Sequence, residues 1–230
     1  ANNAVDVRPS LSINAASSGT MYLRITDALQ ACRDDTGRPN VAIEAWQPTA
    51  IAGVLHWRAE AHSDNRGSFT ELWRASRTAA VAGGPFVQAN MSRSSAGVLR
   101  GMHFHRRQSD LWVLIEGRAL AATTDLRGLL GGGFGAKPSD DVASQIVELT
   151  PGSELLIPPL VAHGFWALED TALMYLVTNE FDGTDEHGFA WDDPRAALDW
   201  PTGEPILSER DQSNPTLAEL ARAAQQSSAR

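Results

Sequence analysis

Short runs of apolar or alternating residues dominate the chain from about Ala50 onward. Examples are "GSFTELW", "LWVLI", "SQIVEL" and "ALMYLVT", and turn residues separate one run from the next. Strands this short and this evenly spaced are typical of an antiparallel sandwich or barrel. The glycine-rich stretch "GLLGGGFGAKPSDD" is predicted to be a surface loop between two strands. The pattern therefore predicts an all-β fold.

Two segments outside this region carry a helical spacing instead. Residues Tyr22 to Asp35 hold apolar side chains at roughly every third or fourth position, which predicts one short amphipathic helix. The last segment, "NPTLAELARAAQQSSAR", begins with an Asn-Pro cap signal. Its apolar positions are Leu217, Leu220 and Ala221, so a terminal helix is expected.

Composition and charge narrow the range of partners. The chain has 230 residues, of which 43% are hydrophobic and 20% charged, and its net charge is −9. A protein that binds duplex nucleic acid normally carries a basic face, so nucleic acid is not expected as a partner. No apolar stretch approaches the roughly 20 residues that a membrane span needs. The lone Cys32 permits no internal disulfide and fits a reducing cytoplasm.

Histidines and an aspartate in "VLRGMHFHRRQSDLWVLIEG" are candidates for chemistry. His103 and His105 lie two positions apart and so face the same side of a strand. With Asp110 and His163 they approximate the two-part metal signature of cupin barrels, in which a glutamate usually stands at the position of Asp110. Three imidazoles and a carboxylate would suit a divalent Fe, Mn, Ni or Zn ion. The alternative for His103 is a solvated or hydrogen-bonded histidine on a sheet face.

Four further residues each have a structural and a functional interpretation. Arg66 in "DNRGSF" and Arg100 in "VLRGMH" are either surface arginines or phosphate ligands, because a guanidinium fork matches phosphate oxygens. Tyr175 is either a core residue with a satisfied hydroxyl or a proton donor at a barrel mouth. Asp211 is either a loop or helix-capping acid or part of a site. Spacing alone does not decide between these interpretations.

A series of ordered motifs carries a resemblance to a known family. They include "DNRGSFTE", "GVLRGMHF", "LLIPPLVAHGFWAL", "MYLVTN" and "LSERD". Their order and spacing resemble the dTDP-4-dehydrorhamnose 3,5-epimerase family, the RmlC-like cupins. The resemblance implies a cupin jelly-roll barrel with short flanking helices. It also divides the chain into an N-terminal extension (1–50), an RmlC-like cupin domain (51–217) and a C-terminal helix or tail (218–230).

The resemblance implies an activity as well. Members of the family act on a dTDP-linked 4-keto-6-deoxyhexose, usually as homodimers, and need no metal or other cofactor. They remove a proton beside the ketone, at C3, C5 or both, and return it on the other face. The implied base is His103, its partner is Asp211, and the acid is Tyr175. The implied substrate contacts, some of them reaching the ligand of a partner subunit, are Arg66, Glu71, Gln88, Asn90, Arg100, His163, Asp110 and Arg210.

The chain departs from the family pattern mainly at Asp110. The family normally has a lysine there, placed to stabilise the enolate oxygen. Two unit charges about 4 Å apart interact by ~4 kcal/mol at an effective dielectric constant of 20, so reversing the sign costs roughly twice that. An inward-turned Arg106 or Arg107, a neutral Asp110, or a metal ion on the histidines and Asp110 would offset this cost. Other departures are His105, where glutamine is common, and Glu180, where an aromatic residue often follows "TN".

Three functions therefore stay open from the sequence. The first is a cytoplasmic epimerase of a dTDP-linked sugar. The second is a metal-dependent cupin enzyme that uses His103, His105, Asp110 and His163. The third is a barrel that binds a nucleotide sugar but has lost turnover together with the lysine.

Overall fold

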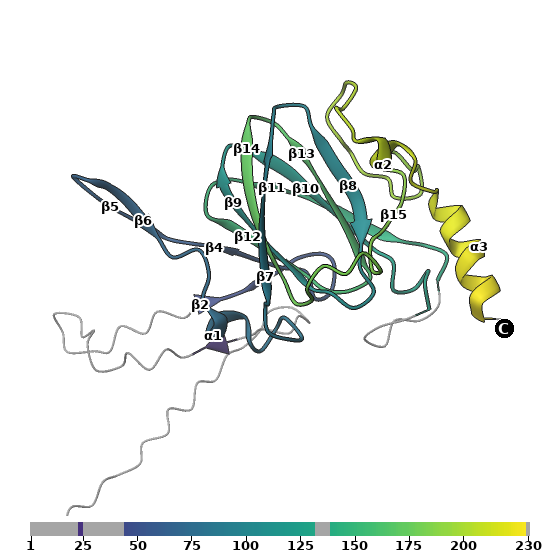
Figure 1. Ribbon diagram of the computed structural model, residues 1–230, viewed down its shortest axis with the longest axis horizontal. Coiled ribbons are helices and arrows are strands. Elements are labelled where there is room, and N and C mark those ends of the chain that lie inside the picture. The colour runs from purple at the N-terminus through teal and green to yellow at the C-terminus, as the bar shows by residue number, and fades with distance from the viewer. Residues whose placement is uncertain (1–22, 25–43, 132–138, 229–230) are drawn as a thin grey trace, which may run out of the picture.

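Two antiparallel sheets form the body of the protein (Figure 1). The computed structural model describes residues 23–24, 44–131 and 139–228. The five-stranded sheet has the order β11 (Ala143–Leu149), β10 (Ala119–Asp125), β13 (Val161–Ala167), β8 (Leu99–Phe104) and β15 (His187–Gly188). The six-stranded sheet has the order β3 (Gln47–Pro48), β4 (Leu55–Arg58), β12 (Ser153–Ile157), β9 (Asp110–Glu116), β14 (Thr171–Val177) and β7 (Gln88–Ser94). The predicted all-β cupin jelly roll with short flanking helices is confirmed.

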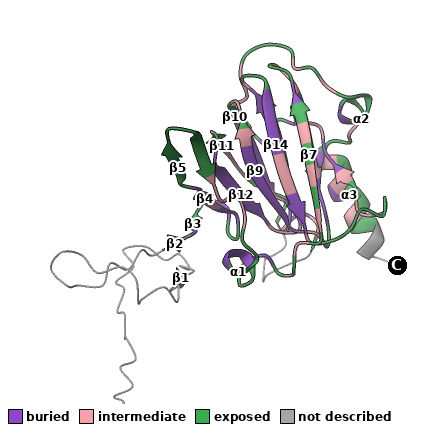
Figure 2. Ribbon diagram, turned by 60° about the vertical axis from the view of Figure 1, so that its left-hand side comes forward, coloured by how far each residue is buried: buried purple, intermediate pink, exposed green. Residues whose placement is uncertain are grey.

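The space between the two sheets holds the main apolar core. Trp112 and Leu114 of β9 point into it and pack in one buried cluster with Leu155 of β12 and Phe165 of β13. The alternate residues of β9, Leu111 and Val113, belong to a second buried cluster on the outer face of the six-stranded sheet. Because both faces of β9 are covered (Figure 2), its sequence is a continuous apolar run and not an alternating one.

The C-terminal segment covers the outer face of the five-stranded sheet. Met102 and Phe104 of β8 pack there against Phe189, Leu217 and Ala221. The last two of these residues belong to helix α3 (Leu217–Ser228), so the predicted terminal helix is confirmed. A four-residue helix, α2 (Glu209–Gln212), precedes it. Figure 1 shows α2 and α3 beside the end of the sheet that carries β8 and β15.

The helix predicted near the N-terminus is wrong at the two of its positions that the structure describes. Strand β1 (Leu23–Arg24) pairs with β2 (Glu44–Ala45), so these first positions of the predicted helix over residues 22–35 are extended. The helix is wrong there because apolar spacing does not reveal a strand partner about 20 residues away. Tyr22 and residues 25–35 lie outside the described residues. The glycine-rich loop does connect two strands, β10 and β11, although its residues 132–138 lie outside the described part.

A two-stranded hairpin, β5 (Ala61–Asp64) and β6 (Gly67–Thr70), projects away from the sheets in Figure 1. Phe69 of β6 is 71% exposed, although it is a large apolar residue. Within the described part of the chain, no helix is both long enough and apolar enough to cross a membrane.

One buried ion pair holds helix α1 (Ala75–Thr78) on the outer face of the six-stranded sheet. An Arg77 guanidinium nitrogen lies 2.6 Å from a carboxylate oxygen of Glu154 on β12, and both side chains are almost fully buried. The guanidinium also lies 3.8 Å above the Trp57 ring of β4. A buried charge that loses its partner is costly, because the remaining charge stays out of water.

We expect Glu154→Ala to lower the free energy of unfolding by roughly 3 kcal/mol, because the buried Arg77 guanidinium would lose its closest carboxylate and keep the half-exposed Glu71. The matched control is Glu148→Ala, which removes a partner of exposed Arg118. That loss should cost less than about 1 kcal/mol, because water screens the pair. Urea unfolding of both variants checks the difference. Equal losses would contradict the role given to the buried pair.

Candidate functional site

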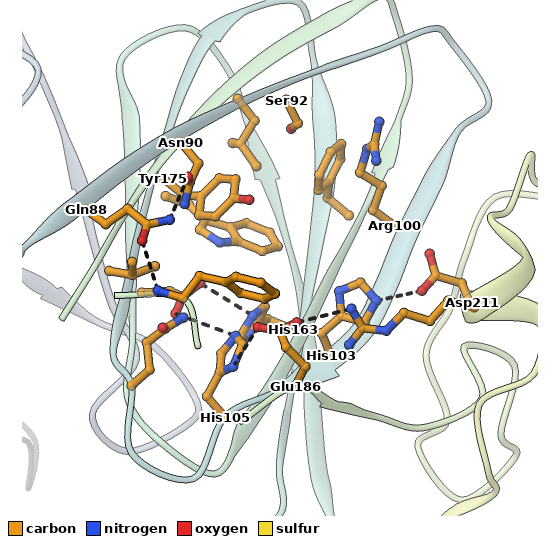
Figure 3. A pocket seen from close by; sticks show the side chains of 18 of the residues that line it. Gln88, Asn90, Ser92, Arg100, His103, His105, His163, Tyr175, Glu186 and Asp211 are labelled. Carbon is orange, nitrogen blue, oxygen red and sulfur yellow. Dashed lines mark hydrogen bonds and ion pairs between the residues drawn. The ribbon is translucent and has the colours of Figure 1, made fainter. Parts of the chain in front are cut away.

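A cavity of about 520 Å³ opens between the two sheets at the end where β8, β9 and β14 carry polar side chains (Figure 3). Ten of the residues singled out from the sequence line it: Gln88, Asn90, Arg100, His103, His105, Asp110, His163, Tyr175, Arg210 and Asp211. Sequence reasoning did not select Ser92, Gln108, Phe181, Glu186 and Ser208, which also line it. Ser92 could have been found, because it continues the every-second-residue row of Gln88 and Asn90.

An irregularity in β8 brings Arg100 and His103 to the same cavity. His103 pairs with His163, and Arg100 pairs with Phe165. The two residues on β8 are three positions apart, whereas their partners on β13 are two positions apart. A regular strand would turn residues three positions apart to opposite faces. Gly101 makes the irregularity possible. Its φ is +141°, and a Cβ there would lie 2.6 Å from the Cα of Gly164.

His103 forms a short hydrogen bond with a residue 108 positions away. Its Nε2 lies 2.6 Å from Oδ1 of Asp211 on helix α2. Ser208 caps this helix, since its Oγ accepts a hydrogen bond from the Asp211 backbone N–H at 3.1 Å. Burial alone would raise the pKa of Asp211, but the hydrogen bond and the charge of His103, with help from Ser208 and the Gly101 backbone, lower it. A carboxylate is therefore held beside the imidazole.

Tyr175 faces the cavity from the opposite sheet. It lies on β14, where its backbone pairs with Asn90 of β7, and Figure 3 shows its ring beside the Gln88 and Asn90 side chains. Burial raises the pKa of Tyr175, and the charges of Asp110 and Glu186 add to the rise. The phenol is therefore protonated at neutral pH and can act as a proton donor.

The row on β7 is polar and partly preorganised. The Gln88 amide nitrogen donates to Oδ1 of Asn90 at 2.9 Å, and the Gln88 amide oxygen accepts from the Phe181 backbone N–H at 2.9 Å. Nε of Arg100, which comes from β8 of the other sheet, donates to Oγ of Ser94 at the end of β7 at 3.0 Å. This wall therefore offers amides and a guanidinium to a polar ligand.

The deepest part of the cavity holds His105, Asp110 and His163, all buried. Burial raises the pKa of the Asp110 carboxyl, although His105 and hydrogen bonds from Gln108 and Trp112 oppose the rise. Burial also lowers the pKa of His163 well below its usual value, and the nearby charges of His105 and His103 lower it further. Among the residues that the structure describes, these three form the group of potential metal ligands, and His103 is not a member of it.

Several predicted residues lie elsewhere. Arg66 is an exposed residue of the β5–β6 hairpin and pairs with Asp64. Glu71 pairs with Arg74 and Arg77, and neither Arg66 nor Glu71 lines the cavity. The structure therefore does not bring these two residues to the pocket of their own chain.

Neither of the two loop arginines that could offset the negative charge of Asp110 turns into the cavity. The Arg107 side chain is half-exposed and donates to Oγ1 of Thr184 at 2.9 Å, and neither Arg106 nor Arg107 lines the cavity. Asp110 instead accepts a hydrogen bond from the Gln108 amide at 2.8 Å.

The fold and the site together define a cupin-type barrel whose interior offers a histidine–aspartate pair on one wall and a protonated tyrosine on the other. A family model described as dTDP-4-dehydrorhamnose 3,5-epimerase matches residues 48–219. The chain belongs to this family.

Curated relatives agree with the family match. The chain is 37% identical over 183 residues to the dTDP-4-dehydrorhamnose 3-epimerase of Streptomyces niveus, covering 75% of this chain and 84% of the relative. It is also 37% identical over 184 residues to the dTDP-4-dehydrorhamnose 3,5-epimerase of Escherichia coli strain K12, covering 76% and 95%.

Solved structures show the same architecture. NovW of Streptomyces spheroides, a 4-keto-6-deoxy sugar epimerase, superposes with a TM-score of 0.68 at 34% identity, covering 78% of this chain and 90% of that one. ChmJ of Streptomyces bikiniensis, a 3'-monoepimerase solved with dTDP-quinovose, gives a TM-score of 0.67 at 27% identity, covering 79% and 96%.

Gly101→Ala tests the close approach of β8 and β13. The added Cβ meets the Gly164 backbone and is also strained by the positive φ, so we expect a loss of roughly 3 kcal/mol or more in the free energy of unfolding. Gly97→Ala is the matched control, because Gly97 has a φ of +83° and nothing within 4 Å of its Cβ position. It should lose only about 1–2 kcal/mol. Thermal unfolding measures both, and equal losses would contradict the steric argument.

Proposed function

We propose that the protein is an epimerase of a dTDP-linked 4-keto-6-deoxyhexose, acting at C3, C5 or both. The observation that carries this proposal is the placement of His103, paired with Asp211, and of Tyr175 on opposing sheets of one cavity. The metal-dependent and non-catalytic alternatives have no support from the relatives. A cytoplasmic location stays a prediction.

His103 is proposed as the base. The Asp211 carboxylate only accepts hydrogen bonds, so the proton on the imidazole lies on Nε2 and Nδ1 keeps a lone pair. A carbon-bound proton beside a ketone is acidic enough for a neutral imidazole to remove it within hydrogen-bond reach. Asp211 then stabilises the imidazolium that forms, as a buried carboxylate does in other histidine pairs.

Tyr175 is proposed as the acid. Removal of the proton leaves an enolate, and inversion requires that a proton reach the carbon from the other face of the ring. The Tyr175 hydroxyl is on the sheet opposite His103 and is protonated at neutral pH because its pKa is raised. It can therefore donate that proton. Solvent then reprotonates the phenolate and accepts the proton held by His103, which restores both groups.

The nucleotide is proposed to lie along the polar wall. Arg100 and Arg210 supply cationic groups for the diphosphate, and the Gln88 and Asn90 amides supply hydrogen bonds. ChmJ, which shares this architecture, was solved with a dTDP-linked sugar. His163 and Asp110 would contact the sugar at the deep end of the cavity.

A homodimer is proposed to account for Arg66 and Glu71. They lie on or next to the projecting β5–β6 hairpin, away from the cavity of their own chain. The hairpin exposes Phe69, and the edge strand β7 exposes Met91, so both have apolar surface that a second copy could cover. In such a dimer the hairpin would carry Arg66 toward the ligand of the partner.

Solvent deuterium incorporation tests the proposed function. The protein is incubated in D2O with dTDP-4-keto-6-deoxyglucose, and label at C3 and C5 is read by NMR. We expect label at one or both carbons, because every proton that returns comes from a group that exchanges with solvent. No label above the non-enzymatic background, with the protein folded, would refute the epimerase.

His103→Asn should lower the rate of label incorporation roughly 100-fold or more, because it removes the base. Affinity for dTDP, measured by calorimetry, should stay largely unchanged, because other residues hold the nucleotide. His187→Gln is the matched control, since His187 lies on β15 beside β8 but does not line the cavity. Retained incorporation in His103→Asn would refute the assigned base.

Tyr175→Phe should separate exchange from inversion. His103 can still remove a proton and return a deuteron to the same face, so label should still enter the starting sugar. The inverted product should form roughly 100-fold more slowly, because its proton donor is missing. NMR of the same reaction reads both outcomes. Unchanged inversion, or loss of both processes in a protein that still binds dTDP, would contradict the role of Tyr175.

Sedimentation analysis tests the dimer. We expect twice the mass of one chain at micromolar concentration and a weaker association for Phe69→Glu, which places a charge on the exposed apolar hairpin. A protein that stays monomeric would refute the dimer and remove the argument that Arg66 acts across subunits.

A further inference from the structure

The deep end of the cavity brings together three buried side chains from both sheets. His105 directly follows β8 and His163 lies on β13 of the five-stranded sheet, whereas Asp110 begins β9 of the six-stranded sheet. One ligand atom from each residue lies within 4.8 Å of the others. Each side chain is less than a tenth exposed. The strand framework, and not a mobile loop tip, therefore fixes their positions.

The hydrogen bonds of the two imidazoles determine which nitrogens face Asp110. Nδ1 of His105 lies 2.6 Å from the Asp185 carbonyl oxygen, and Nδ1 of His163 lies 3.1 Å from the Val161 carbonyl oxygen. A carbonyl oxygen only accepts, so each Nδ1 carries the proton and each neutral ring keeps its lone pair on Nε2. Backbone carbonyls hold many metal-binding histidines in the same way.

Both lone pairs converge on the carboxylate. Nε2 of His105 lies 3.9 Å from Oδ1 of Asp110, and Nε2 of His163 lies 3.7 Å from Oδ2. These separations are too long for hydrogen bonds. Two imidazole lone pairs and a carboxylate are all acceptors, so their convergence in a buried place is favourable only when something positive or proton-donating lies between them.

We propose that His105, Asp110 and His163 bind a divalent first-row transition-metal ion at the deep end of the cavity. Two imidazoles and one carboxylate suit such ions. Bonds of about 2.1 Å place neighbouring ligand atoms roughly 3.0–3.5 Å apart, so the side chains need to move inward by only a few tenths of an ångström. The Gln108 amide donates to Oδ1 of Asp110 at 2.8 Å, and a carboxylate oxygen of Glu186, which is itself paired with Arg210, lies 3.7 Å from Nδ1 of His105.

The site differs from the four-residue set that the sequence suggested. His103 is excluded, because its Nε2 is engaged by Asp211 and it stands outside the cluster. Three protein ligands leave coordination positions open toward the cavity. The ion would add two positive charges to the one negative charge of Asp110, which leaves a net positive charge at the deep end. If the proposed function holds, that positive charge would face the sugar ketone. Only this last consequence rests on the proposed function.

Cobalt binding tests the site without any turnover. Tag-free full-length protein is stripped with a chelator, dialysed and titrated with Co²⁺, whose visible absorption reports its coordination geometry. We expect one equivalent of Co²⁺ per chain, competed by Zn²⁺. Asp110→Asn and His163→Gln should each weaken binding by roughly 100-fold or more, because they remove ligands and not merely their neighbours.

Two variants sharpen the result. His103 lines the same cavity but is not one of the three proposed ligands, so His103→Asn should keep full Co²⁺ affinity. His187→Gln should also keep it. Thermal unfolding provides a second measurement, because an ion that binds only the folded chain raises its melting temperature. Zn²⁺ should stabilise the original protein and His103→Asn but not Asp110→Asn.

The outcomes separate this site from the proposed activity. No Co²⁺ or Zn²⁺ binding, or binding that Asp110→Asn leaves intact, overturns the metal site, and binding that is lost with His103→Asn overturns the three-ligand arrangement. Deuterium incorporation into the sugar is measured separately. Exchange in a protein that binds no ion would leave the epimerase standing, and ion binding without exchange would leave the metal site standing.

Discussion

The hydrogen bond between His103 and Asp211 joins the wall of the barrel that carries the proposed base to the C-terminal segment. Its two atoms are 2.6 Å apart, and helix α2 carries Asp211 to that place only because the segment after β15 wraps the outer face of the five-stranded sheet. The Ser208 cap fixes the start of that helix. Apolar packing that is remote from the chemistry thus determines the tautomer of the proposed base.

The second constraint is the division of the cavity into regions of different charge. The wall formed by β7 and β14 carries amides, a hydroxyl and a phenol, and Arg100 of β8 reaches Ser94 at the end of β7. Arg210 of helix α2 lies on the other side and pairs with Glu186. The deep end carries Asp110 and two imidazoles, and burial raises the pKa of Asp110. An anionic nucleotide fits the first region, whereas the second suits a cation or a proton donor. In the proposed complex, the order of these regions would orient the nucleotide sugar with its ring at the deep end.

The sequence predicted the strands, the terminal helix and most of the cavity lining because these depend on local pattern or on matching motifs. His103 and His105 share a face, as their spacing predicted. Arg100 faces the same cavity only because β8 is irregular opposite Gly164, and that depends on a neighbouring strand. The position of Arg66 depends on the direction of a hairpin, and β1 depends on a distant partner strand. The spacing of apolar residues does not predict which distant segments pair with one another.

A crystal structure of the protein with a dTDP-linked 4-keto sugar, or with a stable analogue of it, tests the account most directly. The account predicts that the sugar ring lies between the two sheets, with the His103 imidazole on one face and the Tyr175 hydroxyl on the other. Both groups should lie about 3–4 Å from C3 or from C5, close enough for proton transfer. A ring with both groups on the same face, or a sugar bound outside the cavity, would contradict it.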